Sequence, residues 1–247
     1  MPLSGDGKRF TRILRVADYE CDIHNRMKLS AILRHMQEIS SAHLDALDVP
    51  YSLLLEHRQV FLLSKVDLQI YRRPQSSEMV QMATTPKVPA GAQFIRHNEM
   101  QDAEGNLLLE AETAWMLVDT DQHQILRPAE FIGDLRYTEA DASPIARRRL
   151  TAPPVQKVGE RAIRFSELDV NDHLNNAVYA DICMDFLPET ELRTCETAAF
   201  YIHFRREARC GDVLQIERGE YEPGSYYLRA EKPEGCCFEA ALRLEKR

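Results

Sequence analysis

The sequence of 247 residues has no excess of positive charge, because 39 acidic residues against 31 basic residues give a formal net charge of −8. A general nucleic-acid-binding protein would carry a basic surface, so we expect no nucleic-acid partner. The sequence also has no apolar run long enough to span a membrane. Its first residues, Met1–Gly7, lack the apolar segment of a secretory signal peptide. We therefore expect a cytoplasmic protein that has no membrane partner.

Cysteines at metal-binding spacing are also missing. The six cysteines show no CxxC spacing and no histidine partners at zinc-finger intervals. They are Cys21, Cys183, Cys195, Cys210, Cys236 and Cys237. We therefore expect free, mostly buried thiols, with no metal and no cofactor. A hydrophobic content of 44% beside 28% charged residues is typical of a chain that buries a core and stays soluble.

What the sequence does contain is one order of elements that occurs twice. A predicted strand at 11–16 precedes an amphipathic helix at about 28–47, whose apolar residues recur at helical spacing. The strands predicted after this helix are 65–70, 78–85, 94–101 and 107–118. In the first of these strands, polar and apolar residues alternate, and the polar side is formed by Lys65, Asp67 and Gln69. The second series is a strand at 162–167, a helix at about 176–187, and strands at 198–204, 212–222, 226–231 and 238–245.

The two series predict an α+β fold made of two copies of one unit. Because no helix separates the later strands of either series, each sheet should be antiparallel. A segment rich in proline and arginine, 141–158, is typical of a linker. We therefore predict an N-terminal domain at 1–140 and a C-terminal domain at 159–247.

The most informative stretch is Asp169–Tyr179, which reads DVNDHLNNAVY. In an extended segment, residues i, i+2 and i+4 point to the same side, so Asp169, Asn171 and His173 should converge. The helix that follows would bring unpaired N–H groups and a partial positive charge to the same place. A general base, hydrogen-bond donors and a helix N-terminus are what the addition of water to a carbonyl group requires. We therefore take the three residues as candidate catalytic residues.

Each of these residues also has a simpler structural interpretation. Asp169 is of a type that bonds to its own backbone in turns, and Asn171 is of a type that forms turns. His173 would then cap the helix. We expect Asn175 and Asn176 to bond the loop and the helix start, and we retain both as candidates for positioning the substrate.

With these residues in view, the sequence resembles the acyl-ACP thioesterases of plants and bacteria, which carry two hotdog folds in one polypeptide. Asp169–Tyr179 resembles the DxNxHxNNxxY signature of that family, and Phe204–Glu207 resembles its aromatic-Arg-Arg-Glu block. His35–Glu38 and the Trp115–Met116 pair resemble segments of its first hotdog. Plant members commonly carry a cysteine after that glutamate, but Ala208 stands here, so a cysteine nucleophile at this position is excluded.

The resemblance implies two tandem hotdog domains, each a long helix wrapped by a curved antiparallel sheet. It implies a thioester hydrolase that releases free fatty acid from acyl-ACP and ends fatty acid synthesis. It adds Glu207 to the catalytic cluster as a carboxylate that activates water, although a plain salt bridge to the neighbouring arginines is the structural alternative. It implies no cofactor. Tyr179 is expected to pack into the sheet rather than to take part in the chemistry.

The resemblance also gives the first hotdog the role of shaping the acyl pocket. The candidate wall residues are Ile32, Met36, Ile39, Val66 and Leu68. Ordinary core residues would show the same pattern, so that interpretation stays open for each of them. In addition, Asp22–Asn25 precedes the first helix in a place comparable to that of the Asp169 motif, and we interpret it as an inactive copy.

Acyl carrier protein is the implied partner, since it is acidic and its phosphopantetheine arm carries a phosphate. Arginine clusters are candidates for receiving it, with solvated surface charge as the alternative. They are Arg72–Arg73, Arg147–Arg149, and Arg205–Arg206 with Arg209.

Three rival functions remain at this stage: an acyl-CoA thioesterase, a hydratase or dehydratase on the same fold, and an acyl-binding protein without catalytic activity. A thiol-release assay with acyl-ACP separates them. The sequence leaves open the preferred chain length, the choice between Asp169 and Glu207 as general base, and whether the protein is a monomer or a homodimer.

Overall fold

The computed structural model describes residues 3–138 and 143–247, and the chain divides into two compact units. The first unit ends at Arg148 and the second begins at Arg149, although Asp67–Ile70 groups with the second unit. This boundary falls within the segment expected to be a linker, 141–158, of which 141 and 142 lie outside the described residues.

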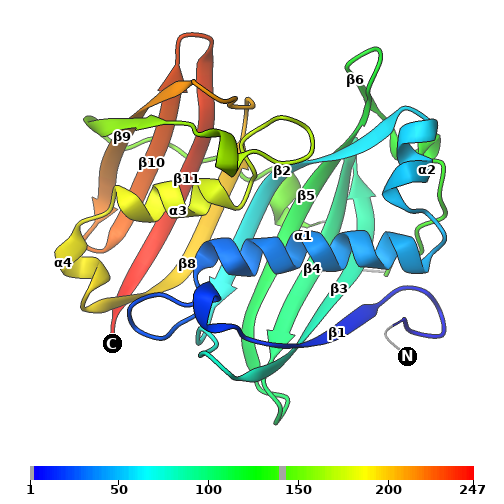
Figure 1. Ribbon diagram of the computed structural model, residues 1–247, viewed down its shortest axis with the longest axis horizontal. Helices are drawn as coiled ribbons and strands as arrows, with labels where there is room; N and C mark the ends of the chain where they lie inside the picture. Colours follow the sequence, from blue (N-terminus) through cyan, green and yellow to red (C-terminus); the bar gives the residue numbers. More distant parts are fainter. Residues whose placement is uncertain (1–2, 139–142) are drawn as a thin grey trace. The chain divides into compact units, whose positions relative to one another are not determined.

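The first unit is an antiparallel sheet with one long helix across its face (Figure 1). Its strands are β1 (Phe10–Arg15), β2 (Gln59–Ile70), β3 (Met79–Ala90), β4 (Gln93–Gln101), β5 (Leu107–Asp119) and β6 (Gln124–Leu126). The order is β1-β3-β4-β5-β2, with β6 paired to β5. The long helix α1 (Leu29–Ala46) buries Ile32, Met36, Ile39 and His43 at helical spacing, so it forms close to the predicted bounds. The short helix α2 (Tyr51–Glu56) and β6 were not predicted.

The second unit repeats this arrangement with a shorter helix (Figure 1). Its helices are α3 (Val178–Asp185) and α4 (Glu189–Leu192), and its strands are β7 (Gln156–Ala162), β8 (Cys195–Phe204), β9 (Val213–Glu222), β10 (Ser225–Lys232) and β11 (Gly235–Lys246). The strand order is β8-β11-β10-β9-β7, and the pairs are antiparallel. The helix has 8 residues, so the expectation of a long helix in each unit holds only for the first.

The strand predicted at 162–167 is wrong. The strand of that region is β7, which pairs with β9 from Gln156 to Ala162 and ends there. A 3-10 turn occupies Phe165–Glu167, where Glu167 Oε2 accepts a hydrogen bond from Arg164 N at 2.8 Å. The side chain of Glu167 therefore closes a tight turn within the predicted strand.

Lys65 also departs from its prediction. The alternating pattern predicts it on the polar side of the strand, but only 6% of it is exposed. Its Nζ donates hydrogen bonds to the carbonyl oxygens of Ile145 (3.1 Å), Ala146 (2.9 Å) and Arg148 (3.3 Å). Alternation marks the two faces of a strand, but it does not reveal that a later segment covers the polar face.

All six cysteines are free thiols, but only Cys183 and Cys237 are buried and Cys210 is exposed. The expectation of mostly buried thiols is therefore wrong. No helix among the described residues is long and apolar enough to cross a membrane.

A buried histidine joins α1 to the sheet of the first unit. His43 has no exposed surface, its Nε2 lies 3.2 Å from the carbonyl oxygen of Gly7, and its Nδ1 lies 3.1 Å from Arg96 Nη1. Burial, and then the positive charge of Arg96, lower the pKa of His43 to about 4. The imidazole is therefore neutral at neutral pH, and its Nδ1 can accept the hydrogen bond from Arg96.

We expect this histidine to make the protein less stable in mild acid. Between the unfolded pKa of 6.5 and the folded value of about 4, the unfolded chain binds a proton that the folded chain excludes. Falling pH therefore lowers the free energy of unfolding by up to about 1.4 kcal/mol per pH unit over this range. Urea unfolding at about pH 7 and about pH 5 should show a smaller loss in His43→Gln than in the wild type. An equal loss in both proteins would contradict this assignment.

Candidate functional site

The loop that carries the motif is a tight turn, so the premise of an extended segment is wrong. Asp169 N donates to the carbonyl oxygen of His173 at 2.8 Å, and Asp172 N donates to that of Asp169 at 3.1 Å. Asp172 has a φ of 61°, in the left-handed region that aspartate tolerates. The turn, rather than strand alternation, therefore brings the backbones of Asp169 and His173 together, with Asn171 between them in the turn.

The carboxylate of Asp169 is engaged in this turn. Its Oδ1 accepts a hydrogen bond from Asn171 N at 2.8 Å, as expected of a turn residue that bonds the backbone two positions on. The structural interpretation of Asp169 is thereby confirmed, while its catalytic role stays a prediction.

His173 meets Glu207, which lies far away in the sequence. His173 Nε2 is 3.4 Å from Glu207 Oε2, and Arg209 Nη2 donates to Glu207 Oε1 at 2.8 Å. The same Arg209 nitrogen lies 3.2 Å from His173 Nε2. About half of the Glu207 side chain and about a quarter of the His173 side chain are exposed, so a ligand in solvent can reach both.

The position of one proton decides how this cluster pairs. When His173 Nε2 carries a hydrogen it can donate to Glu207, and when it does not it can accept from Arg209. The imidazole thus lies between an acceptor and a donor that suit its two states. Such an arrangement can pass a proton between a carboxylate and a third molecule.

Two backbone features hold Glu207 beside the loop. Leu174 N donates to the carbonyl oxygen of Ala208 at 2.8 Å, which links the residue after His173 to the residue after Glu207. Arg209 N donates to Asp212 Oδ2 at 2.9 Å, and Lys232 Nζ donates to the same oxygen at 2.8 Å. The cluster is therefore mounted on a fixed backbone although its side chains are exposed.

The helix end beside the loop offers fewer donors than expected. Asn175 accepts from Ala177 N through its Oδ1 and from Val178 N through its carbonyl oxygen, both at 2.9 Å. Asn175 thus bonds the helix start as predicted, and it also uses two N–H groups that we had expected to face a substrate. No hydrogen bond of the Asn176 side chain is found among the described residues, and its role stays a prediction.

Tyr179 packs as predicted. It is 2% exposed, and its ring lies 5.4 Å from the rings of Phe204 and Phe238 in edge-on contacts. Burial raises the pKa of its hydroxyl above the usual value, which makes it unsuitable as a base.

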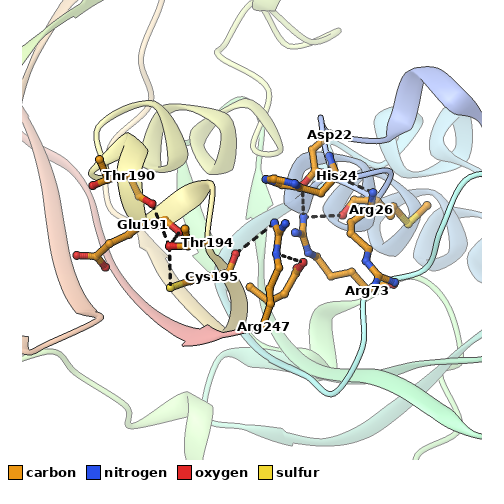
Figure 2. Close-up of polar contacts among 11 residues, drawn as sticks. Asp22, His24, Arg26, Arg73, Thr190, Glu191, Thr194, Cys195 and Arg247 are labelled. Carbon is orange, nitrogen blue, oxygen red and sulfur yellow. Dashed lines mark hydrogen bonds and ion pairs between the residues drawn. The ribbon is translucent and has the colours of Figure 1, made fainter.

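The first unit contains a loop with the same backbone bonds (Figure 2). Asp22 N donates to the carbonyl oxygen of Arg26 at 2.8 Å, and Asn25, with a φ of 59°, donates through its N to that of Asp22. Asp22 Oδ1 accepts from His24 N at 2.9 Å. Asp22, His24, Asn25 and Arg26 therefore occupy the places of Asp169, Asn171, Asp172 and His173.

Side chains differ sharply between the two loops. Met27 N donates to the carbonyl oxygen of Pro74, as Leu174 does to that of Ala208, so Arg73 takes the place of Glu207. Arg73 is buried and its Nη1 donates to Asp22 Oδ2 at 2.7 Å (Figure 2). Burial alone would raise the pKa of Asp22, but Arg73 and the backbone donors lower it below its usual value. This copy lacks the glutamate–histidine pair and holds an ion pair instead.

The predicted acyl-pocket residues are all buried: Ile32 (0%), Met36 (2%), Ile39 (1%), Val66 (1%) and Leu68 (1%). Leu68 groups with the second unit and the others with the first. Burial fits a pocket wall and an ordinary core equally, so their role stays a prediction.

Four of the eight arginines expected to receive an acidic partner have carboxylate partners. Arg72 pairs with Glu78, Arg73 with Asp22, and Arg205 with Glu239. Three exposed arginines of the predicted clusters make no ion pair with a described residue: Arg147, Arg149 and Arg206. Arg209, which was predicted only as part of a cluster, is instead a member of the candidate site.

Taken together, the two units are hotdog folds, each a helix lying across a curved antiparallel sheet. The chain matches the acyl-ACP thioesterase N-terminal domain over residues 7–133 and the acyl-ACP thioesterase C-terminal domain over residues 152–245. It belongs to the acyl-ACP thioesterase family.

Solved structures share this fold over the whole chain. An acyl-ACP thioesterase from Bacteroides thetaiotaomicron aligns with a TM-score of 0.85 at 17% identity, covering 98% of this chain and 100% of its own. The 12:0-ACP thioesterase from Umbellularia californica aligns with a TM-score of 0.80 at 18% identity, covering 100% of both chains.

Among curated relatives, oleoyl-acyl carrier protein thioesterase 2 of Arabidopsis thaliana is 22% identical over 86% of this chain and 63% of its own length. An acyl-[acyl-carrier-protein] hydrolase of Cuphea viscosissima is 21% identical over 97% of this chain and 60% of its own. The chain therefore spans about three fifths of the length of the curated relatives it matches.

The two matched loops allow a paired test of the ion pair. Asp22→Asn keeps the turn acceptor but leaves the buried Arg73 without its carboxylate, so we expect the free energy of unfolding to fall by about 2–4 kcal/mol. Asp169→Asn makes the same change where no arginine is paired, and we expect a loss below about 1 kcal/mol. Urea unfolding of both variants measures the difference. Equal losses would show that Arg73 does not depend on Asp22.

Proposed function

We propose that this protein hydrolyses fatty acyl thioesters of acyl carrier protein and releases free fatty acid. The pairing of His173 with Glu207 beside the motif loop carries this proposal, because it places a carboxylate oxygen 3.4 Å from an imidazole nitrogen, and a small side-chain adjustment would bring the two within hydrogen-bond reach. Family membership and the names of the relatives support acyl-ACP as the substrate.

In the proposed reaction, Glu207 accepts a proton from water as the water oxygen adds to the thioester carbonyl carbon. The carbon–sulfur bond then breaks, and the leaving thiolate receives a proton through His173. Asn171, exposed at the tip of the turn, provides an amide for the developing negative charge. The products are a fatty acid and the carrier thiol.

This scheme assigns the base to Glu207 rather than to Asp169. The Asp169 carboxylate is bonded to Asn171 N within the turn, whereas Glu207 contacts the histidine that can relay its proton. Asp169 then acts by holding the loop. Arg209, which donates a hydrogen bond to Glu207, orients that carboxylate until substrate enters.

Substitution of the base tests the assignment. Glu207→Gln preserves the shape of the side chain but cannot accept a proton, so we expect kcat for acyl-ACP to fall by about 10²–10⁴-fold. Asp169→Asn retains the hydrogen bond within the turn, so we expect a smaller decrease in kcat. Thiol release with a chromogenic reagent measures both. If both variants keep near wild-type kcat, the assignment fails, and if only Asp169→Asn is inactive, the two roles are reversed.

We further propose that the carrier docks on exposed arginines that lack carboxylate partners. Arg206 lies next to Glu207 in the sequence and makes no ion pair with a described residue, which leaves its charge available to a phosphate or an acidic protein.

Charge reversal at this arginine distinguishes an effect on carrier binding from an effect on catalysis. Arg206→Glu should raise KM for acyl-ACP about tenfold or more, with little change for a small thioester that lacks the carrier. Arg193→Glu in α4 is the matched control, since Arg193 already pairs with Glu189 on the surface. An unchanged KM in Arg206→Glu would remove this arginine from the docking surface.

Parallel assays with acyl-CoA test whether coenzyme A is the carrier instead of acyl carrier protein.

A further inference from the structure

A single nitrogen of Arg209 contacts both members of the His173–Glu207 pair. Arg209 Nη2 donates to Glu207 Oε1 at 2.8 Å and lies 3.2 Å from His173 Nε2. This nitrogen carries two hydrogens, so it can donate one to each partner at the same time. His173 Nε2 then accepts a hydrogen bond and carries no proton, and it faces Glu207 Oε2 across 3.4 Å without a hydrogen between them.

This arrangement fits a site that awaits substrate, but it blocks the proposed proton relay. A ring nitrogen has one lone pair, and while Arg209 occupies that of His173 Nε2, the atom cannot receive a proton from Glu207. The relay therefore requires the guanidinium to leave the histidine. The backbone N of Arg209 is held by Asp212 Oδ2 at 2.9 Å, but 58% of its side chain is exposed. Only the side chain has to move.

The region beside this pair has few donors for negative charge on a substrate. When water adds to a thioester, the electron pair of the carbonyl π bond moves to the oxygen, which then needs hydrogen-bond donors. Asn175 already occupies two N–H groups next to the motif, those of Ala177 and Val178. In the proposed reaction the amide of Asn171 is the donor to this oxygen, and an amide carries no charge.

Arg209 has the donors and the charge that this oxygen requires. Its Nε and Nη1 make no hydrogen bond with a described residue, and Nη2 has a hydrogen to offer once it leaves His173. A hydrogen bond from a charged donor is about twice as strong as one between neutral groups. We propose that Arg209 is a catalytic residue, whose guanidinium moves from His173 Nε2 to the carbonyl oxygen of the substrate and stabilises the negative charge that develops there.

This movement couples the two stages of the reaction, and it rests on the proposed hydrolysis. As the water oxygen bonds to the carbonyl carbon, Glu207 takes the water proton and the π electron pair moves to the oxygen beside Arg209. The vacated His173 Nε2 receives that proton from Glu207. When the electron pair returns and the carbon–sulfur bond breaks, His173 gives the proton to the sulfur. Arg209 donates hydrogen bonds and transfers no proton.

Loss of the guanidinium should lower kcat without weakening substrate binding. In Arg209→Gln we expect kcat for acyl-ACP to fall by about 10²–10³-fold and KM to stay within about threefold, because the donor acts in the transition state. Guanidinium ion added to Arg209→Ala should restore part of the lost kcat, and Arg209→Lys should retain part of it. Arg193→Gln, which removes a surface arginine paired with Glu189, is the matched control and should keep wild-type kcat.

Three kinetic outcomes would contradict the assignment. They are a kcat in Arg209→Gln within about threefold of the wild type, a change confined to KM, and a loss that neither guanidinium ion nor Arg209→Lys relieves.

A binding measurement keeps this proposal separate from the proposed function. Octylphosphonate is a stable tetrahedral anion with an apolar tail, and octanol has the same tail without the charge. By titration calorimetry, the wild type should bind octylphosphonate at least about tenfold more tightly than Arg209→Gln does, while octanol binding stays within about threefold. Octylphosphonate affinities that are equal in the wild type and Arg209→Gln would overturn the proposal.

Glu207→Gln completes the comparison. It removes the proposed base and a competing carboxylate but keeps the guanidinium, so it should bind octylphosphonate at least as tightly as the wild type. If Glu207→Gln hydrolyses acyl-ACP at the wild-type rate, the proposed base is wrong, and the octylphosphonate affinities still decide the role of Arg209.

Discussion

One backbone hydrogen bond underlies the candidate site: the N–H of Leu174 donates to the carbonyl oxygen of Ala208. It joins the end of the motif loop to the segment that leaves β8, and His173 and Glu207 are the residues just before each partner. The attraction between the two side chains is too weak to fix their positions, because an exposed ion pair contributes little to stability. The backbone therefore sets the geometry of the His173–Glu207 pair.

The first unit shows that this backbone does not by itself create a catalytic group. The bond from Met27 to Pro74 repeats the same connection, and Asp22 repeats the turn of Asp169. Arg73 stands where Glu207 stands in the second unit, and it closes the loop with a buried ion pair. One scaffold thus carries a glutamate–histidine pair in one unit and an ion pair in the other, since Arg26 stands at the place of His173 and Arg73 at that of Glu207.

Many elements of the fold were predictable, because they depend on local periodicity. The helix α1 and the strands β4, β5, β9 and β10 formed within a few residues of their expected bounds, since their apolar residues follow the period of each structure. Two of the misses have one cause in common. The side chains of Glu167 and Lys65 bond to backbone groups that alternation does not reveal.

The sequence by itself determined the class of the fold, its duplication and the membership of Asp169, Asn171 and His173 in one motif, because residues near one another in the chain leave a local pattern. Only the tertiary structure decided that the motif is a closed turn, that Asp169 is engaged in it, and that Arg209 joins His173 and Glu207. The last of these relations joins the segment after β8 to a loop more than thirty residues earlier. Contacts of that range arise when strands pair and backbones meet, and no local pattern records them.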